Sequence, residues 1–199
     1  MSLKVDSKAR GLIFDIDGTL ADTMPTHFQS WQQVAERYGF VYPEELFYKL
    51  AGMSTAEIVR YINENQRKNL VVEEVVRAKN QAYLGLNEKI RLIEPVFKIV
   101  KEFYGRIPMA LGTGEYQEIA LINIRITGLD RYFDKIVTAD DVTKSKPDPE
   151  TFLKCAQLIN VPPEYCQVFE DGGAGLEAAR RAGMITTDVR PFIREDVSA

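Results

Sequence analysis

Residues 10–23 read R-G-L-I-F-D-I-D-G-T-L-A-D-T, so a short apolar run is followed at once by two carboxylates and a glycine. The apolar run predicts a buried strand over residues 12–14. Asp15 and Asp17 would be unfavourable at the end of such a strand, and would repel each other, unless a cation or a shared proton compensates them. Gly18 permits a tight turn whose backbone N–H groups can face a ligand. We therefore expect a divalent cation, a carboxylate nucleophile and a second carboxyl that moves protons.

These residues alone also fit an ordinary solvated turn, because acid–glycine pairs are common in turns. The motif D-x-D-G also begins calcium-binding loops. An EF-hand is excluded, since the later ligands and the closing Glu do not follow. The choice between a reactive site and a turn depends on the rest of the chain.

Composition narrows the class of protein. A chain of 199 residues allows one large domain, or a core domain with a smaller insertion. The net charge of −4 argues against a general nucleic-acid or acidic-membrane surface, and we expect neither partner. His27 is the only histidine, so a His-clustered metal site is excluded. Cys155 and Cys166 lack CxxC spacing and predict no disulfide framework. With no membrane-spanning run, signal peptide or oligomer signal, we expect a cytoplasmic monomer.

The chain changes its pattern near residue 93. Before this point the sequence predicts helices and no convincing strand; after it, strands alternate with helices. This alternation predicts an α/β fold with a doubly wound, mainly parallel sheet and helices on both faces. The early helices are expected over 25–38, 43–49, 55–65 and 72–83. The later strands are expected over 108–112, 135–138, 167–169 and 185–189. The later helices are expected over 95–104, 116–126, 149–159 and 175–182.

Polar residues follow several of these expected strands. Asp15, Thr113 and the pair Glu170-Asp171 each stand at a strand end. In a parallel sheet, ligands bind beyond the carboxyl ends of the strands, near the point where strand order reverses. We therefore expect distant parts of the chain to bring these groups to one edge of the sheet.

Four segments in this order resemble the four motifs of the haloacid dehalogenase superfamily of aspartyl phosphotransferases. The helical insertion is similar to the four-helix cap of the β-phosphoglucomutase-like branch. The resemblance implies a catalytic core at 1–21 and 93–199 and a cap at 22–92. The segments are Asp15-Ile16-Asp17-Gly18-Thr19-Leu20, Leu111-Gly112-Thr113, Lys146-Pro147-Asp148-Pro149 and Glu170-Asp171.

The runs 26–31 and 108–114 most resemble fructose-1-phosphate/6-phosphogluconate-type sugar phosphatases. This implies Mg²⁺-dependent hydrolysis of a small phosphorylated sugar or polyol. In that chemistry Asp15 attacks phosphorus and Asp17 first protonates the leaving oxygen and then deprotonates water. Mg²⁺ would contact Asp15, Asp171 and the backbone carbonyl of Asp17, with Glu170 supporting it directly or through water.

The resemblance also implies residues that bind the phosphate. Thr113 offers a hydroxyl, although a strand-end cap is an equal alternative on local grounds. Lys146 offers a positive charge and is preferred to Lys144 because it directly precedes Pro147. We also expect Gly18 and Thr19 to bind the substrate, together with Gly114.

The insertion supplies two further expected substrate contacts. His27 is at the start of its first helix, where a surface or hinge role is the alternative. Gly52 heads a loop that in related caps reaches the active site, and a simple turn is its alternative. The mutase branch carries an Arg three residues after this glycine, where this chain has Thr55. The difference argues against a mutase, which must grip a second phosphate.

Two other positions depart from the family pattern. Glu115 stands where relatives often have a small polar residue, and a carboxylate there would repel phosphate unless it is paired. Gly172 replaces the usual serine after the fourth motif. Neither change removes a group that the chemistry requires.

Other functions fit the sequence less well. Gly173-Ala174-Gly175-Leu176-Glu177-Ala178 matches the dinucleotide pattern G-x-G-x-x-A, but it comes late in the chain and directly follows two acids. A β-phosphoglucomutase would use the same two aspartates and return the phosphoryl group to sugar. A non-catalytic protein would not need all of the reactive residues, and no G-x-S-x-G indicates a serine hydrolase.

Overall fold

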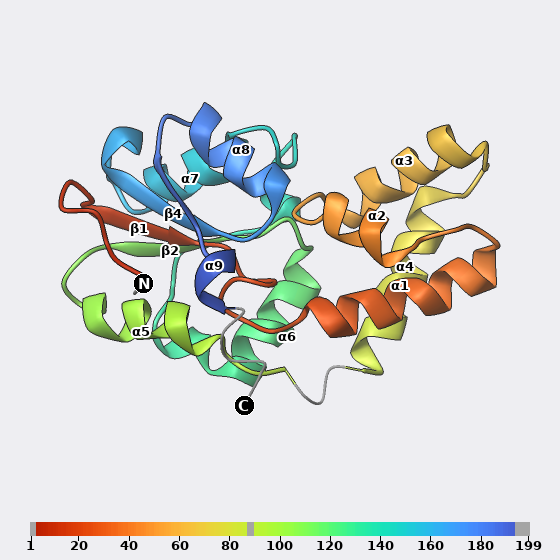
Figure 1. Cartoon of the computed structure of the whole chain (residues 1–199), viewed down its shortest axis with the longest axis horizontal. Coiled ribbons are helices and arrows are strands. Elements are labelled where there is room, and N and C mark those ends of the chain that lie inside the picture. Colours follow the sequence, from red (N-terminus) through yellow and green to blue (C-terminus); the bar gives the residue numbers. More distant parts are fainter. Residues whose placement is uncertain (1–2, 87–89, 194–199) are drawn as a thin grey trace.

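The computed structural model describes residues 3–86 and 90–193, and these contain a parallel sheet in the order β3-β2-β1-β4-β5 (Figure 1). The order reverses at β1, which has β2 on one side and β4 on the other. The predicted α/β class and parallel sheet are therefore confirmed. The strands are β1 (Gly11–Phe14), β2 (Met109–Gly112), β3 (Ile136–Val137), β4 (Cys166–Glu170) and β5 (Ile185–Asp188).

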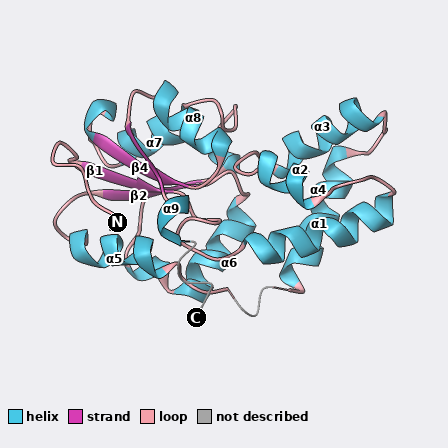
Figure 2. Ribbon diagram, viewed as in Figure 1, coloured by secondary structure: helices cyan, strands magenta, loops and turns pink. Residues whose placement is uncertain are grey.

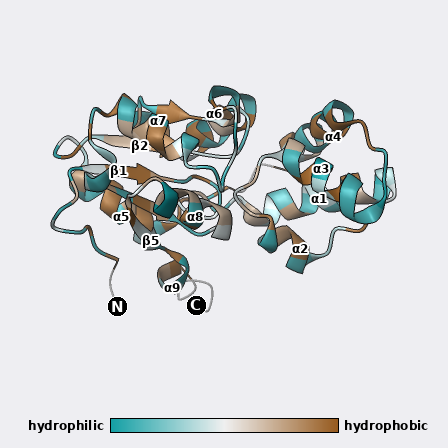
Figure 3. Cartoon of the chain, turned by 90° about the horizontal axis from the view of Figure 1, so that it is seen from above, coloured by the Kyte–Doolittle hydropathy of each residue, from teal (hydrophilic) through white to brown (hydrophobic). Residues whose placement is uncertain are grey.

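Helices bury both faces of the sheet. Successive side chains of a strand point to opposite faces, so Leu12 and Phe14 enter one core and Ile13 enters the other. The Phe14 ring also stacks on Phe169 of β4, with ring centroids 4.8 Å apart. In Figure 3 β1 is coloured as hydrophobic, whereas the surrounding helices carry both colours. The first core contains α5 (Glu94–Phe103) and α6 (Gln117–Thr127), and the second contains α7 (Glu150–Leu158) and α8 (Gly173–Arg181).

Four helices lie to one side of the sheet and form what we call the helical insert, residues 24–84 (Figure 2). The insert has its own apolar core, in which Trp31, Phe40, Ile62 and Val75 are buried. Its helices are α1 (Met24–Tyr38), α2 (Glu44–Lys49), α3 (Thr55–Gln66) and α4 (Val72–Leu84). Tyr83, near the end of α4, packs with the first core of the sheet instead of the core of the insert.

The chain enters and leaves the insert at one place. The Asp22 N–H donates to the Arg91 carbonyl at 2.8 Å, and the Ile93 N–H donates to the Leu20 carbonyl at 2.8 Å. These bonds join the outgoing and returning segments side by side. The division into a core at 1–21 and 93–199 and a cap at 22–92 stays a prediction, and its residues 1–2, 87–89 and 194–199 lie outside the described residues.

Local signals place the helix ends well. Gly39 ends α1 in the left-handed conformation, with φ of 68°, which glycine adopts without strain. The Ser54 side chain accepts a hydrogen bond from the Glu57 N–H, and the Glu57 carboxylate accepts one from the Ser54 N–H. These two bonds form a capping box at the start of α3. The sequence misses α9 (Arg190–Ile193), because four residues are too few to show a helical period.

Two further expectations concern the whole chain. Cys155 and Cys166 are both buried and free, as expected without a disulfide framework. Among the described helices, none combines the length and the apolar character needed to cross a bilayer.

Candidate active site

An acidic cluster forms where β1 and β4 end. Asp15, Glu170 and Asp171 each place one carboxylate oxygen within 4.8 Å of the others. The Asp15 N–H donates to the Phe169 carbonyl at 3.1 Å, which fixes the end of β1 against β4. Residues more than 150 positions apart therefore meet at the sheet edge, as the strand pattern predicts.

A buried lysine lies behind this cluster. Lys146 is fully buried, and its Nζ donates to Asp15 Oδ1 at 2.7 Å, to Glu170 Oε2 at 2.8 Å and to the Gly112 carbonyl at 3.1 Å. Burial alone would lower the pKa of Lys146, but the charges of Asp15 and Glu170 raise it above its usual range. Lys144 is largely exposed and lies 3.9 Å from Asp148. The structure thus brings Lys146, and not Lys144, to the acids.

One ammonium does not balance three carboxylates. Burial and the charge of Glu170 raise the pKa of Asp15 well above its usual value. The same two causes raise the pKa of Asp171 to about 7, although Thr19 Oγ1 donates to Asp171 Oδ1 at 2.8 Å. This all-oxygen donor set with excess negative charge fits a divalent cation such as Mg²⁺. Asp15, Glu170 and Asp171 are the side chains that would hold it.

Asp17 is held apart from the cluster by a separate set of polar groups. Its Oδ1 accepts from Thr23 Oγ1 at 2.8 Å and Asn123 Nδ2 at 3.2 Å, and lies 3.2 Å from His27 Nε2. Its Oδ2 accepts from Thr113 Oγ1 at 3.2 Å. Asp17 is therefore not among the side chains that form the acidic cluster, so its expected metal contact rests on its backbone carbonyl alone.

His27 is buried, and this excludes the alternative of a surface residue. Its ring stacks on Tyr83, with centroids 4.3 Å apart, and Tyr83 Oη donates to Asn123 Oδ1 at 2.9 Å. Burial would raise the pKa of Asp17, but the hydrogen bond and charge of His27 outweigh it and hold that pKa at about 2. His27 thus contacts Asp17 and also lines the pocket described next.

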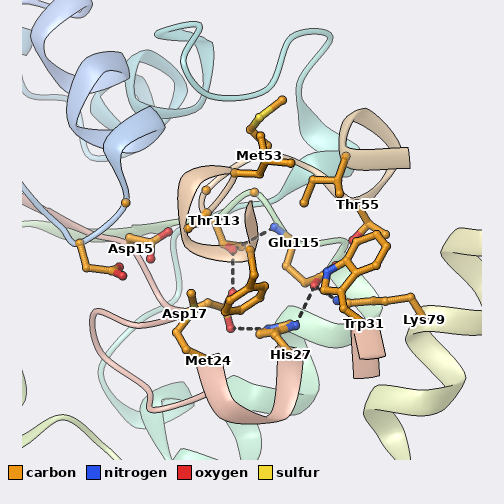
Figure 4. Close-up of a pocket in the computed structure, with 18 of the residues that line it drawn as sticks. Asp15, Asp17, Met24, His27, Trp31, Met53, Thr55, Lys79, Thr113 and Glu115 are labelled. Carbon is orange, nitrogen blue, oxygen red and sulfur yellow. Dashed lines mark hydrogen bonds and ion pairs between the residues drawn. The ribbon is translucent and has the colours of Figure 1, made fainter. Parts of the chain in front are cut away.

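A pocket opens between the sheet edge and the helical insert (Figure 4). The two aspartates, Asp15 and Asp17, line it together with Thr113. Gly52 and Gly114 also line it, and a Cβ on Gly114 would stand 2.6 Å from the Gly52 carbonyl oxygen, so glycine permits this close approach. The insert contributes a mainly apolar wall of Met24, Trp31, Tyr42, Phe47, Leu50, Met53 and Ile58.

Gly18 and Thr19 are beside the acids and not among the lining residues. Gly18 has φ of 86°, and a Cβ there would stand 2.5 Å from Asp171 Oδ2. Thr19 is fully buried and bonds to Asp171. The structure therefore gives both residues a contact with the acidic cluster, while their expected contact with substrate stays a prediction.

The glycine-rich turn after β4 wraps around Glu170. The Gly172 N–H donates to Glu170 Oε1 at 2.8 Å, and a Cβ on Gly175 would overlap the Glu170 carboxylate. Close packing on a carboxylate thus explains these glycines. A dinucleotide pyrophosphate bound here would face that negative charge, which argues against the oxidoreductase alternative.

Comparisons with known proteins agree with this geometry. Residues 12–189 match the family described as haloacid dehalogenase-like hydrolase. The fructose-1-phosphate phosphatase YqaB of Escherichia coli strain K12 is 42% identical over 181 residues, covering 90% of this chain and 96% of that protein. The β-phosphoglucomutase of Bacillus subtilis strain 168 is 28% identical over 199 residues, covering 94% and 88%.

A solved structure is similar over most of its length. The β-phosphoglucomutase of Clostridium difficile superposes with a TM-score of 0.78 at 27% identity, covering 90% of this chain and 84% of that one. The resemblance inferred from the motifs is confirmed by these matches. The chain therefore belongs to the haloacid dehalogenase-like hydrolases and is an enzyme of that family.

Proposed function

We propose that this enzyme, a phosphatase of the haloacid dehalogenase-like family, hydrolyses a small phosphorylated sugar or polyol through an aspartyl-phosphate. One observation carries the proposal. The pocket has two aspartates in different surroundings: Asp15 lies among the acids and Lys146, and Asp17 lies in its own hydrogen-bond network. Without a cation the pKa of Asp15 is raised, so a bound cation would be needed to keep Asp15 ionised as the nucleophile. The pKa of Asp17 is lowered, so Asp17 begins as a proton acceptor.

In the first half of the reaction an Asp15 carboxylate oxygen attacks phosphorus. The bond between phosphorus and the sugar oxygen breaks, and Asp17 passes a proton to that oxygen. Because the pKa of Asp17 is about 2, the free enzyme holds this group ionised. The proton can arrive with the substrate, since the second ionisation of a phosphate monoester lies near pH 6. Lys146 keeps Asp15 in place through its bond to Oδ1.

In the second half the aspartyl-phosphate is hydrolysed. Asp17 takes a proton from a water molecule as that water attacks phosphorus, and the bond from phosphorus to Asp15 breaks. Inorganic phosphate leaves and the Asp15 carboxylate is restored. A divalent cation held by Asp15, Glu170 and Asp171 would neutralise phosphate charge during both steps. We expect that cation to be Mg²⁺.

The substrate class rests on the relatives and on the pocket wall. The Escherichia coli relative carries the name fructose-1-phosphate phosphatase, and a Thermotoga maritima relative, 35% identical over 175 residues, is named phosphorylated carbohydrates phosphatase. The wall combines rings such as Trp31 and Tyr42 with polar groups such as Thr55. Such a wall suits the carbon–hydrogen faces and hydroxyls of a small sugar.

Phosphoryl transfer between sugar hydroxyls is the alternative that the Bacillus subtilis relative supports. It would use Asp15 and Asp17 in the same way, with a sugar hydroxyl in place of water. A mutase must also hold a second phosphate. Thr55, which stands where the mutase branch has an arginine, lines the pocket and offers no charge for that phosphate.

A panel of phosphomonoesters tests the proposal. We expect sugar and polyol monophosphates to release inorganic phosphate with Mg²⁺, and EDTA to stop the release. Analysis of the organic product distinguishes a free sugar from a sugar with its phosphate moved. Phosphate release that is unaffected by EDTA would contradict the role of the cation, and an isomeric sugar phosphate as the main product would support the mutase.

A further inference from the structure

A second ion pair joins the helical insert to the segment that follows β2. Lys79 of α4 is only 1% exposed, and its Nζ donates to Glu115 Oε2 at 2.5 Å. Glu115 lies two residues beyond Thr113 and is 7% exposed. Both side chains line the pocket, and Figure 4 shows His27 between Asp17 and Glu115. The carboxylate expected to repel phosphate is therefore paired.

Three further contacts surround the pair. Glu115 Oε1 accepts from the Tyr116 N–H at 3.0 Å, and Glu115 Oε2 lies 3.8 Å from His27 Nδ1. The Lys79 ammonium stands 5.2 Å from the centre of the Tyr83 ring. Within the described part of the chain, Glu115 is the carboxylate that forms an ion pair with Lys79, and the Lys79 charge also lowers the pKa of Asp17.

Lys79 is the only lysine or arginine among the described residues that line the pocket. Lys146 is fully buried behind the acidic cluster and is already bonded to Asp15 and Glu170. A substrate with a second anionic group would need a cation at the insert side of the pocket, and Lys79 is the candidate. Drawing Lys79 away would leave the buried Glu115 carboxylate without its partner, which is strongly unfavourable.

We propose that the Lys79–Glu115 pair makes the pocket select substrates with a single anionic group, the phosphate that is removed. A second phosphate or a carboxylate on the same molecule is rejected, because Glu115 holds the cation that would bind it. Of the two substrates named in the family resemblance, fructose 1-phosphate should therefore be accepted and 6-phosphogluconate, which carries a carboxylate, should be rejected. The inference rests on the proposed function and specifies its substrate class further: monophosphates of otherwise neutral sugars or polyols. The apolar wall, including Trp31 and Phe47, fits such uncharged groups.

Matched substrates test this selection. A ketohexose 1-phosphate and the corresponding 1,6-bisphosphate lose the same phosphate and differ only in the second one. A hexitol phosphate and a phosphorylated sugar acid make a similar pair that differs by a carboxylate. For the wild type we expect kcat/KM to favour the singly charged member of each pair by at least about tenfold, because one unit charge in a pocket of effective dielectric constant about 20 has an effect of this order.

Substitution of Glu115 frees the cation. In Glu115→Gln we expect kcat/KM for the bisphosphate, relative to the monophosphate, to rise about tenfold, mainly through a lower KM. The double variant Lys79→Met with Glu115→Gln lacks the cation, so this gain should disappear. Glu118→Gln removes the same charge from an exposed position of α6 and should leave the substrate ratio unchanged.

Each outcome has a clear meaning. Equal wild-type kcat/KM for mono- and bisphosphate overturns the inference even if no variant folds. The same holds if Glu115→Gln slows both substrates equally, since this would show that the pair serves only to hold the insert in place. A wild type that releases phosphate from no monoester, including a generic aryl phosphate, overturns the proposed function and this inference with it. Activity with an unchanged ratio overturns the inference alone.

Discussion

Removing the Asp171 charge is expected to stabilise the metal-free protein. In the folded chain burial and Glu170 raise the pKa of Asp171 to about 7, whereas its ordinary value is 3.8. The folded state therefore keeps a proton that the unfolded chain releases between about pH 4 and pH 7. Stability falls as pH rises through this window, because the folded state binds more protons there. Asp171→Asn places a neutral side chain of the same shape at this position.

The shift sets the size of the effect. The difference between a pKa of about 7 in the folded chain and the ordinary pKa of 3.8 corresponds to a loss of at most about 4 kcal/mol in the free energy of unfolding. Asp171 is only partly buried, so solvent screens some of this energy and we expect about 2 kcal/mol at pH 8. For a chain of this length that is a rise in Tm of about 4 to 8 °C. Near pH 4 the variant and the wild type should have nearly equal stability.

Urea or thermal unfolding with EDTA, at pH steps from 4 to 8, measures the difference between variant and wild type. Adding Mg²⁺ should then reverse the order. The wild type gains about 2.7 kcal/mol at a concentration of 100 times Kd, and the variant gains less because it has lost a charged ligand. Asp130→Asn removes a charge at an exposed position and serves as the control. If Asp171→Asn followed the wild-type curve at every pH, the excess negative charge inferred for the cluster would be wrong.

Three further substitutions test the roles assigned here. Asp15→Asn should reduce phosphate release by at least about 10³-fold with an unchanged circular dichroism spectrum, and retention of full activity would exclude it as the nucleophile. Asp17→Asn should slow turnover by about 10²–10⁴-fold, with accumulation of phosphorylated protein for substrates with good leaving groups; normal rates would exclude its acid–base role. Gly175→Ala should lower the free energy of unfolding by about 1–3 kcal/mol and, because the new Cβ displaces the Glu170 carboxylate, weaken Mg²⁺ binding. Urea unfolding measures the first effect and Mg²⁺ titration the second. Gly173→Ala is its control, since a Cβ there meets nothing within 4 Å, and equal effects in both would disprove the packing argument.

Much of the fold follows from local sequence patterns. The apolar run before Asp15 and the run before Thr113 become β1 and β2, because a strand covered on both faces needs a continuous apolar sequence. Parallel strands then bring their carboxyl ends to one edge, which is why Asp15, Thr113 and Glu170 could be expected together. Lys146 is preferred to Lys144 because it directly precedes Pro147 in the third motif of the family resemblance, and the structure buries it against Asp15 and Glu170.

The surroundings of Asp17 could not be predicted in the same way. Thr23, Asn123 and Tyr83 reach this network from separate parts of the chain, and no local period records which helices meet. The burial of Lys79 could have been expected from the helical period. Lys79 lies on the buried stripe of α4, four residues after the buried Val75. A lysine on a buried stripe indicates a paired carboxylate nearby.

The pocket wall has consequences for how such an enzyme can diversify. The groups assigned to bond making and breaking, Asp15 and Asp17, lie directly beyond the end of β1, while Trp31, Tyr42 and Phe47 line the same pocket from an insert with its own core. Exchanging one of these rings for another side chain would remodel the recognition surface and leave the attacking carboxylate in place. New metabolites can therefore be accepted through changes in one layer of the molecule, while the reactive layer stays constant.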